Sequence, residues 1–123
     1  SPKMNFISTN ITNKNGNGTE VNIFGSSKIT VPKTSASASE GDQVQLGIRP
    51  EHLLVNQDGD ATWESKVFVV EKLGSGTFLY LEKDGEPLVV EAEGDTNIVV
   101  GDTIKIGFVA TKCHLFDTNN QAF

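Results

Sequence analysis

Hydrophobic and polar residues alternate in two short segments of the chain that resemble one another. In residues 43–48 (QVQLGI) and again in residues 103–108 (TIKIGF), the apolar positions follow a period of two. This period is typical of a β-strand that buries one side. Each segment directly follows the dipeptide Gly-Asp, at residues 41–42 and 101–102, which favours a tight turn leading into the strand. The repetition predicts a duplicated strand-entry turn and an approximate internal duplication.

Other stretches also have the composition of β-strands. Residues 61–72 (ATWESKVFVVEK) predict a long strand that ends at the Gly-Ser-Gly of residues 74–76. Residues 77–83 (TFLYLEK) and 87–92 (PLVVEA) flank Asp84-Gly85, which is a common hairpin turn signal. These patterns predict a hairpin of two strands joined at Asp84-Gly85.

The first forty residues complete the expected secondary structure. The segments MNFISTNI and EVNIFG are separated by Asn-Lys-Asn-Gly-Asn-Gly at residues 13–18, which predicts a hairpin connection. Residues 33–40 (KTSASASE) are small and polar without an apolar period, and they predict a loop. No amphipathic helix of ten or more residues is indicated. The pattern therefore predicts an all-β fold, as one compact domain or as two merged small barrels.

Composition and charge exclude several classes of protein. The 123-residue chain has a net charge of −6 and only ten Lys and Arg residues, which argues against nucleic acid as a partner. A single cysteine, Cys113, allows no internal disulfide and fits a cytosolic location. No apolar run approaches the ~20 residues of a membrane-spanning helix. The start at Ser1-Pro2-Lys3, without Met, suggests a piece of a longer chain.

The candidate catalytic and metal-binding signals are weak. The Gly-Ser-Gly of residues 74–76 lacks the rest of a phosphate-binding loop and precedes a strand, so a bend is expected there. Cys113 and His114 are adjacent, and adjacent side chains on a strand face opposite ways. His52 is distant in sequence, so neither a zinc site nor a Cys–His nucleophile is expected. We therefore predict no catalytic residues, no metal and no enzyme activity for this chain.

Residues 48–53 (IRPEHL) form the densest unusual cluster. Pro50 removes an amide donor and restricts Arg49, so it should end the strand. Arg49 and Glu51 then flank a rigid corner. They could form a local ion pair or cap strand-end carbonyls, or they could present a fixed charged knob to another protein.

Five segments of the chain, taken in order, resemble a known family. They are SPKMNFI, LGIRPEHL, VVEKLGSGTFLYLE, GDTIKIGF and KCHLFD. Their order and sequence resemble the C-terminal regulatory region of the ATP-binding subunits of maltose-type (MalK/UgpC-type) sugar ABC importers. LGIRPEHL at residues 46–53 and CHLFD at residues 113–117 carry the most specific resemblance, whereas residues 9–40 resemble little. The resemblance otherwise covers nearly the whole chain, residues 1–123.

This resemblance implies a fold and a role. The fold is an oligonucleotide/oligosaccharide-binding-type (TOBE) β-barrel assembly that follows a separate ATPase domain. The region would be non-catalytic and would hold no cofactor, because ATP and Mg belong to the ATPase domain of the parent chain. Its partners would be a second copy of the subunit, its own ATPase domain, the membrane permease subunits and, in some members, a regulatory protein. The location would be cytoplasmic, on the inner face of the cell membrane.

The resemblance also assigns candidate residues. Gly47 is expected to allow a close backbone approach, and Phe116 is expected either to anchor a two-fold interface or to pack in the core. The candidates for a regulatory surface are Gly47, Arg49, Pro50, Glu51 and His52. The candidates for self-association are His114, Leu115 and Phe116.

Two alternatives belong to other functional classes. Related small barrels bind oxyanions such as molybdate, and Lys66, Lys72 and Lys105 could contribute to such a site, although the net negative charge opposes it. A carbohydrate-binding module could use Trp63 and Tyr80 to stack on sugar rings, although two aromatic residues so far apart are more often core residues.

Overall fold

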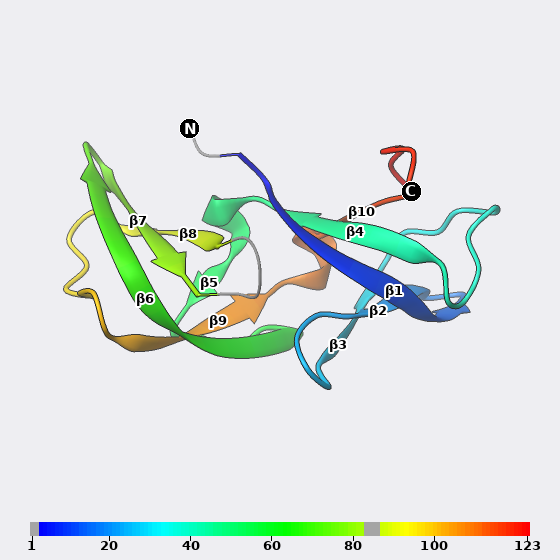
Figure 1. The fold of residues 1–123 in the computed structure, drawn as a ribbon, viewed down its shortest axis with the longest axis horizontal. Coiled ribbons are helices and arrows are strands. Elements are labelled where there is room, and N and C mark those ends of the chain that lie inside the picture. Colours follow the sequence, from blue (N-terminus) through cyan, green and yellow to red (C-terminus); the bar gives the residue numbers. More distant parts are fainter. Residues whose placement is uncertain (1–2, 83–86) are drawn as a thin grey trace.

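Two curled antiparallel β-sheets lie side by side along the long axis of the protein (Figure 1). The structure is a computed structural model and describes residues 3–82 and 87–123. The predicted turn at Asp84-Gly85 falls outside these residues. No α-helix occurs in the described residues, which contain strands and two short 3-10 turns, η1 (Pro50–His52) and η2 (Ala110–Lys112). The predicted all-β class is confirmed.

Each sheet has five strands. The first half of the molecule contains β1 (Asn5–Asn15), β2 (Gly18–Asn22), β3 (Lys28–Val31), β4 (Gln43–Ile48) and β10 (His114–Phe116). The second half contains β5 (Leu54–Val55), β6 (Ala61–Leu73), β7 (Gly76–Leu81), β8 (Leu88–Glu93) and β9 (Thr103–Phe108).

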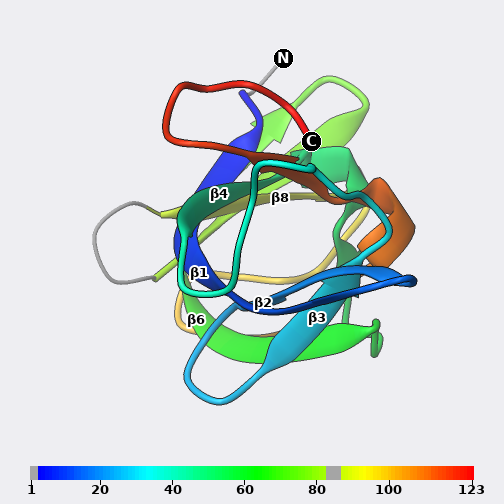
Figure 2. The same ribbon diagram turned by 90° about the vertical axis from the view of Figure 1, so that its right-hand side faces the viewer.

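Each sheet takes one edge strand from the other half of the sequence. β5 follows η1 in the chain but pairs with β9 of the second half. β10 follows η2 but pairs with β4 of the first half. Figure 2, which looks along the long axis, shows that β1 to β4 curve around a common centre and that the C-terminal segment lies along one side. Neither sheet is therefore complete without the strand that the other half provides.

The predicted duplication is confirmed by the hydrogen bonds of the two Gly-Asp turns. The Gly41 N–H donates to a β1 carbonyl at 2.8 Å, and the Asp42 carboxylate accepts the Ser39 N–H at 2.9 Å. Gly101 and Asp102 make the corresponding bonds, to β6 and within their own turn, at 2.8 and 2.9 Å. Gly41 and Gly101 have φ of 89° and 97°, which a residue with a side chain rarely adopts.

The duplication does not relate the two histidines to one another. β10 pairs its first residue, His114, with the glycine of β4, and β5 pairs its first residue, Leu54, with the glycine of β9. His114 therefore corresponds to Leu54, and His52, in η1, corresponds to Lys112, in η2. The histidines have separate roles in the two halves.

One predicted boundary is wrong. Residues 13–18 were expected to connect two strands, but β1 extends to Asn15 and only residues 16–17 form the turn. Cross-strand backbone pairing continues through Asn13 and Lys14, because polar side chains can face solvent while the backbone remains in the ladder. The predicted loop over residues 33–40 and the long strand before residue 74 are confirmed.

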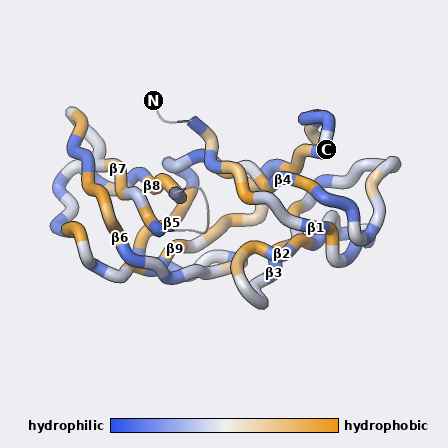
Figure 3. The backbone as a smooth tube through the Cα atoms, viewed as in Figure 1, coloured by the Kyte–Doolittle hydropathy of each residue, from blue (hydrophilic) through white to orange (hydrophobic). Residues whose placement is uncertain are grey.

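The apolar faces of both sheets form one continuous core. Hydrophobic segments lie along the strands of both halves (Figure 3). Asn5 joins the halves: its side-chain amide donates to the Val89 carbonyl at 2.8 Å and accepts the Val89 N–H at 2.9 Å. Phe24 of the first half stacks on Trp63 of the second at 4.2 Å. Among the described residues, no helix is long and apolar enough to span a membrane.

Candidate functional site

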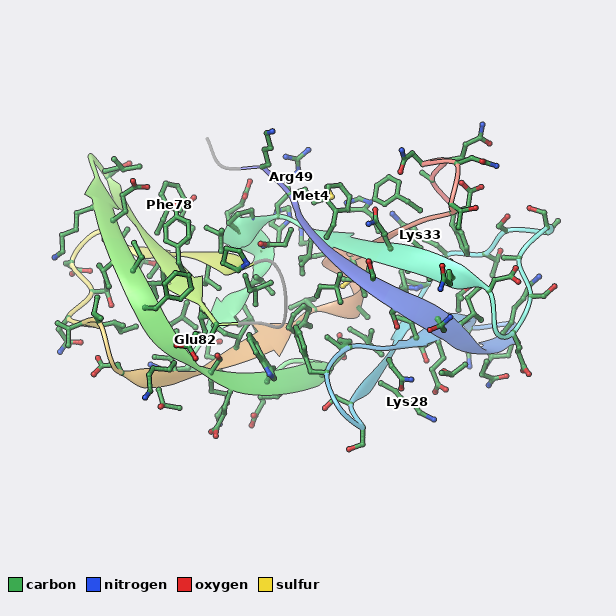
Figure 4. The ribbon with its side chains drawn as sticks, in the orientation of Figure 1. Met4, Lys28, Lys33, Arg49, Phe78 and Glu82 are labelled. Carbon is green, nitrogen blue, oxygen red and sulfur yellow. The ribbon has the colours of Figure 1, made fainter. Side chains whose placement is uncertain are left out.

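The pairing of β4 with β10 brings the two predicted groups of site residues together. His114 lies opposite Gly47, and Phe116 lies opposite Gln45. One expected self-association residue, His114, therefore lies beside the expected regulatory residue Gly47, and the charge of Arg49 also acts on His114. Met4 and Arg49 lie along the same upper side of the molecule in Figure 4, and Lys33 lies further along the first half.

Gly47 makes room for side chains that lie across β4. A Cβ atom at this position would lie 2.5 Å from the Met4 sulfur and 3.0 Å from Cε2 of Phe116. The expected close approach is present, but side chains make it, and the prediction of a close backbone approach is wrong. The Phe116 ring also meets the edge of Phe6, with 5.7 Å between centroids and 67° between planes. Phe6 is 41% exposed, so an apolar platform faces solvent here.

Cationic groups border this platform. The Lys33 ammonium lies 2.9 Å from Nδ1 of His114. Lysine can only donate, so Nδ1 must accept, which requires a neutral imidazole with its proton on Nε2. Burial, and then the charges of Lys33, Arg49 and His52, lower the pKa of His114. His114 is thus held neutral between two permanent cations.

We name this region the aromatic–basic surface and define it by six residues from β1 and the residue before it, the β3–β4 loop, the junction of β4 with η1, and β10. Its chemistry contrasts with that of the whole chain, which has a net charge of −6. In the part of the chain that the structure describes, the one ion pair joins Lys105 to Asp58, at 3.2 Å. Arg49 and Glu51 are exposed and do not form the local ion pair considered from sequence. The aromatic–basic surface comprises Met4, Phe6, Lys33, Arg49, His114 and Phe116.

One predicted self-association residue is wrong. Leu115 is fully buried in the core, because alternate residues of β10 face opposite sides of the sheet. A buried side chain of this kind stabilises the fold and cannot contact a second copy. His114 and Phe116 are partly exposed and face outward, so Phe116 is not a core residue. Among the regulatory candidates, Gly47 and Pro50 are buried.

Cys113 has the properties of a core residue. Its side chain is fully buried, and its thiol donates to the Val109 carbonyl at 3.5 Å. Burial and the nearby Asp60 carboxylate raise the pKa of Cys113 to about 12, so the thiol stays protonated. His114 faces the other way, as expected from sequence. No group of three His, Cys, Asp or Glu side chains within residues 3–82 and 87–123 could hold a metal ion.

A polar groove of about 490 Å³ runs beside β4 and the C-terminal turn. The two aromatic residues considered for sugar stacking, Trp63 and Tyr80, do not line it. Trp63 is instead partly buried and stacks on Phe24, and the Tyr80 hydroxyl donates to Glu71 at 3.3 Å. The groove is lined by Ser8, Thr9, Asn10, Gln43, Val44, Gln45, Asp117, Thr118 and Asn120.

Sequence reasoning missed three members of the aromatic–basic surface, namely Met4, Phe6 and Lys33. Phe6 carried a usable signal, because it is an aromatic residue on the solvent side of an alternating strand whose next residue, Ile7, is buried. Lys33 gave no signal, since its contact with His114 joins residues 81 positions apart.

Comparison with known proteins identifies the family to which the chain belongs. A family model described as the TOBE domain matches residues 46–116, and one described as the MalK OB fold domain matches residues 1–53. The chain belongs to the TOBE domain family. The two matches overlap within β4 and η1, where the exchange of strands begins, so the resemblance and the OB-type fold inferred from sequence are confirmed.

This TOBE chain is similar to parts of larger transport proteins. It is 38% identical over 124 residues to the maltose/maltodextrin import ATP-binding protein MalK of Vibrio cholerae, covering 99% of the chain and 33% of the relative. It is 34% identical over 125 residues to the alpha-glucoside transport ATP-binding protein AglK of Rhizobium meliloti, covering 100% of the chain and 34% of the relative. The chain therefore spans about one third of the length of these relatives.

A solved structure also shares the fold of this TOBE chain. The cytoplasmic molybdate-binding protein ModG superposes with a TM-score of 0.75 at 12% identity, covering 90% of this chain and 94% of ModG. At this level of identity the similarity shows a common architecture of paired small barrels and nothing further.

Proposed function

We propose that the chain is the C-terminal regulatory and dimerisation region of the ATP-binding subunit of a bacterial carbohydrate ABC importer. The observation that carries the proposal is the alignment of almost the whole chain with ATP-binding subunits of sugar importers. The region itself does no chemistry; ATP and Mg bind to an ATPase domain of the parent chain. Its partners are that domain, a second subunit, the permease subunits and a regulatory protein, at the cytoplasmic face of the membrane.

The region works through differences in affinity. The ATPase domains of an importer alternate between open and closed arrangements, and the regulatory regions remain attached to both. A partner that binds one arrangement more tightly shifts the balance by the ratio of its two affinities. A stiff body made of two interlocked sheets suits this role, because it transmits a docking event without deforming.

We assign the aromatic–basic surface to the regulatory protein. Its exposed Phe6 and Phe116 edges offer apolar contact, and Lys33 and Arg49 offer charge. A partner with acidic side chains around an apolar centre would complement both features. A second copy of the same surface would not, because a two-fold interface would bring like charges together.

A chimera tests the proposed function. The corresponding third of the Vibrio cholerae relative is replaced by this chain, and maltose uptake is measured in cells that lack their own subunit. We expect the chimera to restore uptake, while a subunit lacking the region does not. A chimera that is present at normal amounts, assembles with the permease and fails to restore uptake would count against the proposal.

The aromatic–basic surface is tested in the same chimera. Phe6→Ser combined with Arg49→Glu should weaken the repression of maltose uptake that follows addition of glucose, because the partner loses an apolar contact and meets a reversed charge. Lys66→Glu, which reverses an exposed charge in the second half, serves as the control and should leave repression intact. If the unaltered chimera, the double variant and the Lys66→Glu variant are repressed equally, the regulatory protein does not bind this surface.

The second candidate function, a sensor of small oxyanions, is supported by the fold that the chain shares with ModG. The lysines considered for it do not favour the site, since Lys105 is held by Asp58. Calorimetry with molybdate and sulfate distinguishes the two functions. Saturable binding would favour the sensor, and no heat of binding would leave the regulatory region as the proposed function.

A further inference from the structure

The polar groove lies on the outer side of the first sheet, between β1, β4 and the turn that follows β10 (Figure 1). Ser8 of β1 pairs with Gln45 of β4, and Asn10 pairs with Gln43. Val44, between the two glutamines, is buried, so the glutamine side chains point out of the sheet and into the groove. Four uncharged polar side chains therefore form one wall of the groove on two hydrogen-bonded strands.

The C-terminal turn forms the opposite wall. Oδ1 of Asp117 accepts the Asn119 N–H at 2.8 Å and the Gln121 N–H at 2.9 Å, which fixes both the carboxylate and the turn. A second hollow of about 330 Å³ shares Gln43, Asp117 and Thr118 with the groove, so the concave surface continues past the turn. Both walls are built by the fold itself and need no ligand to form.

The second half shows what keeps this groove open. Gln45 corresponds to Lys105, because each lies two residues before the matched glycine of its strand. Thr118 corresponds to Asp58, because β10 and β5 pair with their strands in the same register. In the second half the Lys105 ammonium lies 3.2 Å from the Asp58 carboxylate and bridges the strand to the following loop. Gln45 and Thr118 cannot form this ion pair, and both of them line the groove.

The groups in the groove select one class of ligand. Among the lining residues in the described part of the chain, only Asp117 is charged, so the lining offers no cation to an anionic ligand. A single carboxylate is too few ligands for a metal ion. The amides and hydroxyls both donate and accept hydrogen bonds, and Phe116, which pairs with Gln45, places an apolar ring next to them. A groove of about 490 Å³ lies within the size range of small-molecule sites.

We propose that this groove binds a neutral carbohydrate. Hydroxyl groups of the sugar donate to the Asp117 carboxylate and to the glutamine carbonyls, and they accept from the glutamine NH₂ groups. The groove is open to water on one side, so each of these hydrogen bonds adds little and the affinity is in the millimolar range. This inference goes beyond the proposed function, which requires no small ligand in this region.

An NMR titration of the 123-residue chain with glucose, maltose and glucose 6-phosphate tests the proposal. Glucose or maltose should produce saturable shifts with a Kd below about 10 mM. The largest shifts should occur at the side-chain NH₂ groups of Gln43 and Gln45 and at the backbone N–H groups of residues 117–120. Glucose 6-phosphate should bind more weakly than glucose, because its phosphate meets the Asp117 carboxylate and no lining cation.

A pair of matched variants locates the binding site. Gln45→Lys/Thr118→Asp places the ion pair of the second half across the groove, and it should fold because the second half already carries that pair. The Kd for the sugar should rise at least about tenfold. The control Lys105→Gln/Asp58→Thr removes the ion pair from the second half and should leave the Kd unchanged. Gln43→Thr, which introduces the residue of the second half, should raise the Kd about threefold and provides an independent variant.

Three results would overturn the proposal. The first is the absence of saturable shifts with both glucose and maltose at a Kd below about 10 mM. The second is binding that persists unchanged in the folded Gln45→Lys/Thr118→Asp variant, or shifts that lie away from the groove. The third is tighter binding of glucose 6-phosphate than of glucose, which would assign the site to anions. None of these results affects the chimera test, so the two proposals can fail separately.

Discussion

The two halves of this molecule share a backbone plan and differ in what they present to solvent. Each half has a bulged first strand, a Gly-Asp turn and a closing strand taken from the other half. The first half presents cations and aromatic edges, whereas the second presents uncharged apolar side chains around its turn. The comparison teaches that the duplicated backbone fixes the core, while the outward positions are free to acquire separate binding roles.

The two halves also differ at a matched glycine, Gly47 in β4 and Gly107 in β9, which is the next-to-last residue of its strand in each half. At Gly47 the space of the absent side chain is filled by Met4 and Phe116. At Gly107 it is filled by backbone, because a Cβ atom would lie 2.6 Å from the Gln57 carbonyl oxygen and 2.8 Å from the Gly59 nitrogen. Gly47 therefore makes room for side chains of the aromatic–basic surface, and Gly107 makes room for the backbone of residues 57–59.

The largest expected effect comes from adding a methyl group at these glycines. Gly107→Ala should lower the free energy of unfolding by about 3 kcal/mol, because the backbone of residues 57–59 must move. Gly47→Ala should cost about 1 kcal/mol, because the flexible Met4 side chain can turn away. Urea unfolding of both variants measures the difference. Equal losses would show that the two glycines have the same role after all.

A smaller effect should separate two buried threonines, one in each half. The Thr19 hydroxyl donates to the Lys33 carbonyl at 2.7 Å, so Thr19→Val should cost about 1–2 kcal/mol. The Thr77 hydroxyl is buried and has no hydrogen-bond partner among the described residues. Thr77→Val should therefore be neutral or stabilising by up to about 1 kcal/mol. Thermal unfolding checks both, and a large loss for Thr77→Val would reveal a partner for its hydroxyl.

The smallest expected effect is a dependence on pH that belongs to the first half alone, because the residue that corresponds to His114 is Leu54. The folded state lowers the pKa of His114, mainly by burial and then by Lys33. The unfolded chain therefore binds the proton more readily, and stability should be complete above the ordinary histidine pKa of about 6.5 and fall as the pH drops below it.

Unfolding measured between about pH 5 and pH 8 checks this pH dependence. His114→Gln should flatten the profile, and Lys33→Gln should make the loss of stability at low pH smaller, since removing the cation raises the pKa of His114 toward its ordinary value. An unchanged slope in both variants would assign the pH dependence to groups other than His114.

The alternation of apolar residues was sufficient to predict the fold class and most strands. Residues 43–48 and 103–108 form the strands that their period of two predicts, and each Gly-Asp turn leads into its strand. The exchange of β5 and β10 was not predictable, because strands of two and three residues have too short a pattern to choose a partner. Their pairing depends on contacts between residues far apart in sequence.

The candidate site was only partly predictable for the same reason. The motif at residues 46–53 located β4 and its corner correctly, but its partner strand and Lys33 lie far away in sequence. The burial of Leu115 could have been inferred, because Cys113 and Leu115 alternate with His114 and Phe116. The exposure of Phe68, Val69, Val99 and Val100 was not apparent from sequence. Their contrast with polar residues of the first half appears only when the two halves are matched residue by residue.

The exchanged strands also determine how this protein could be divided. A cut in the loop at residues 56–60 would separate two fragments that each lack the closing strand of their own sheet. Each fragment would carry the strand that the other requires, together with exposed apolar residues that favour recombination. The protein should therefore behave as a natural complementation pair, in which two separately made pieces regain their structure only when they are mixed.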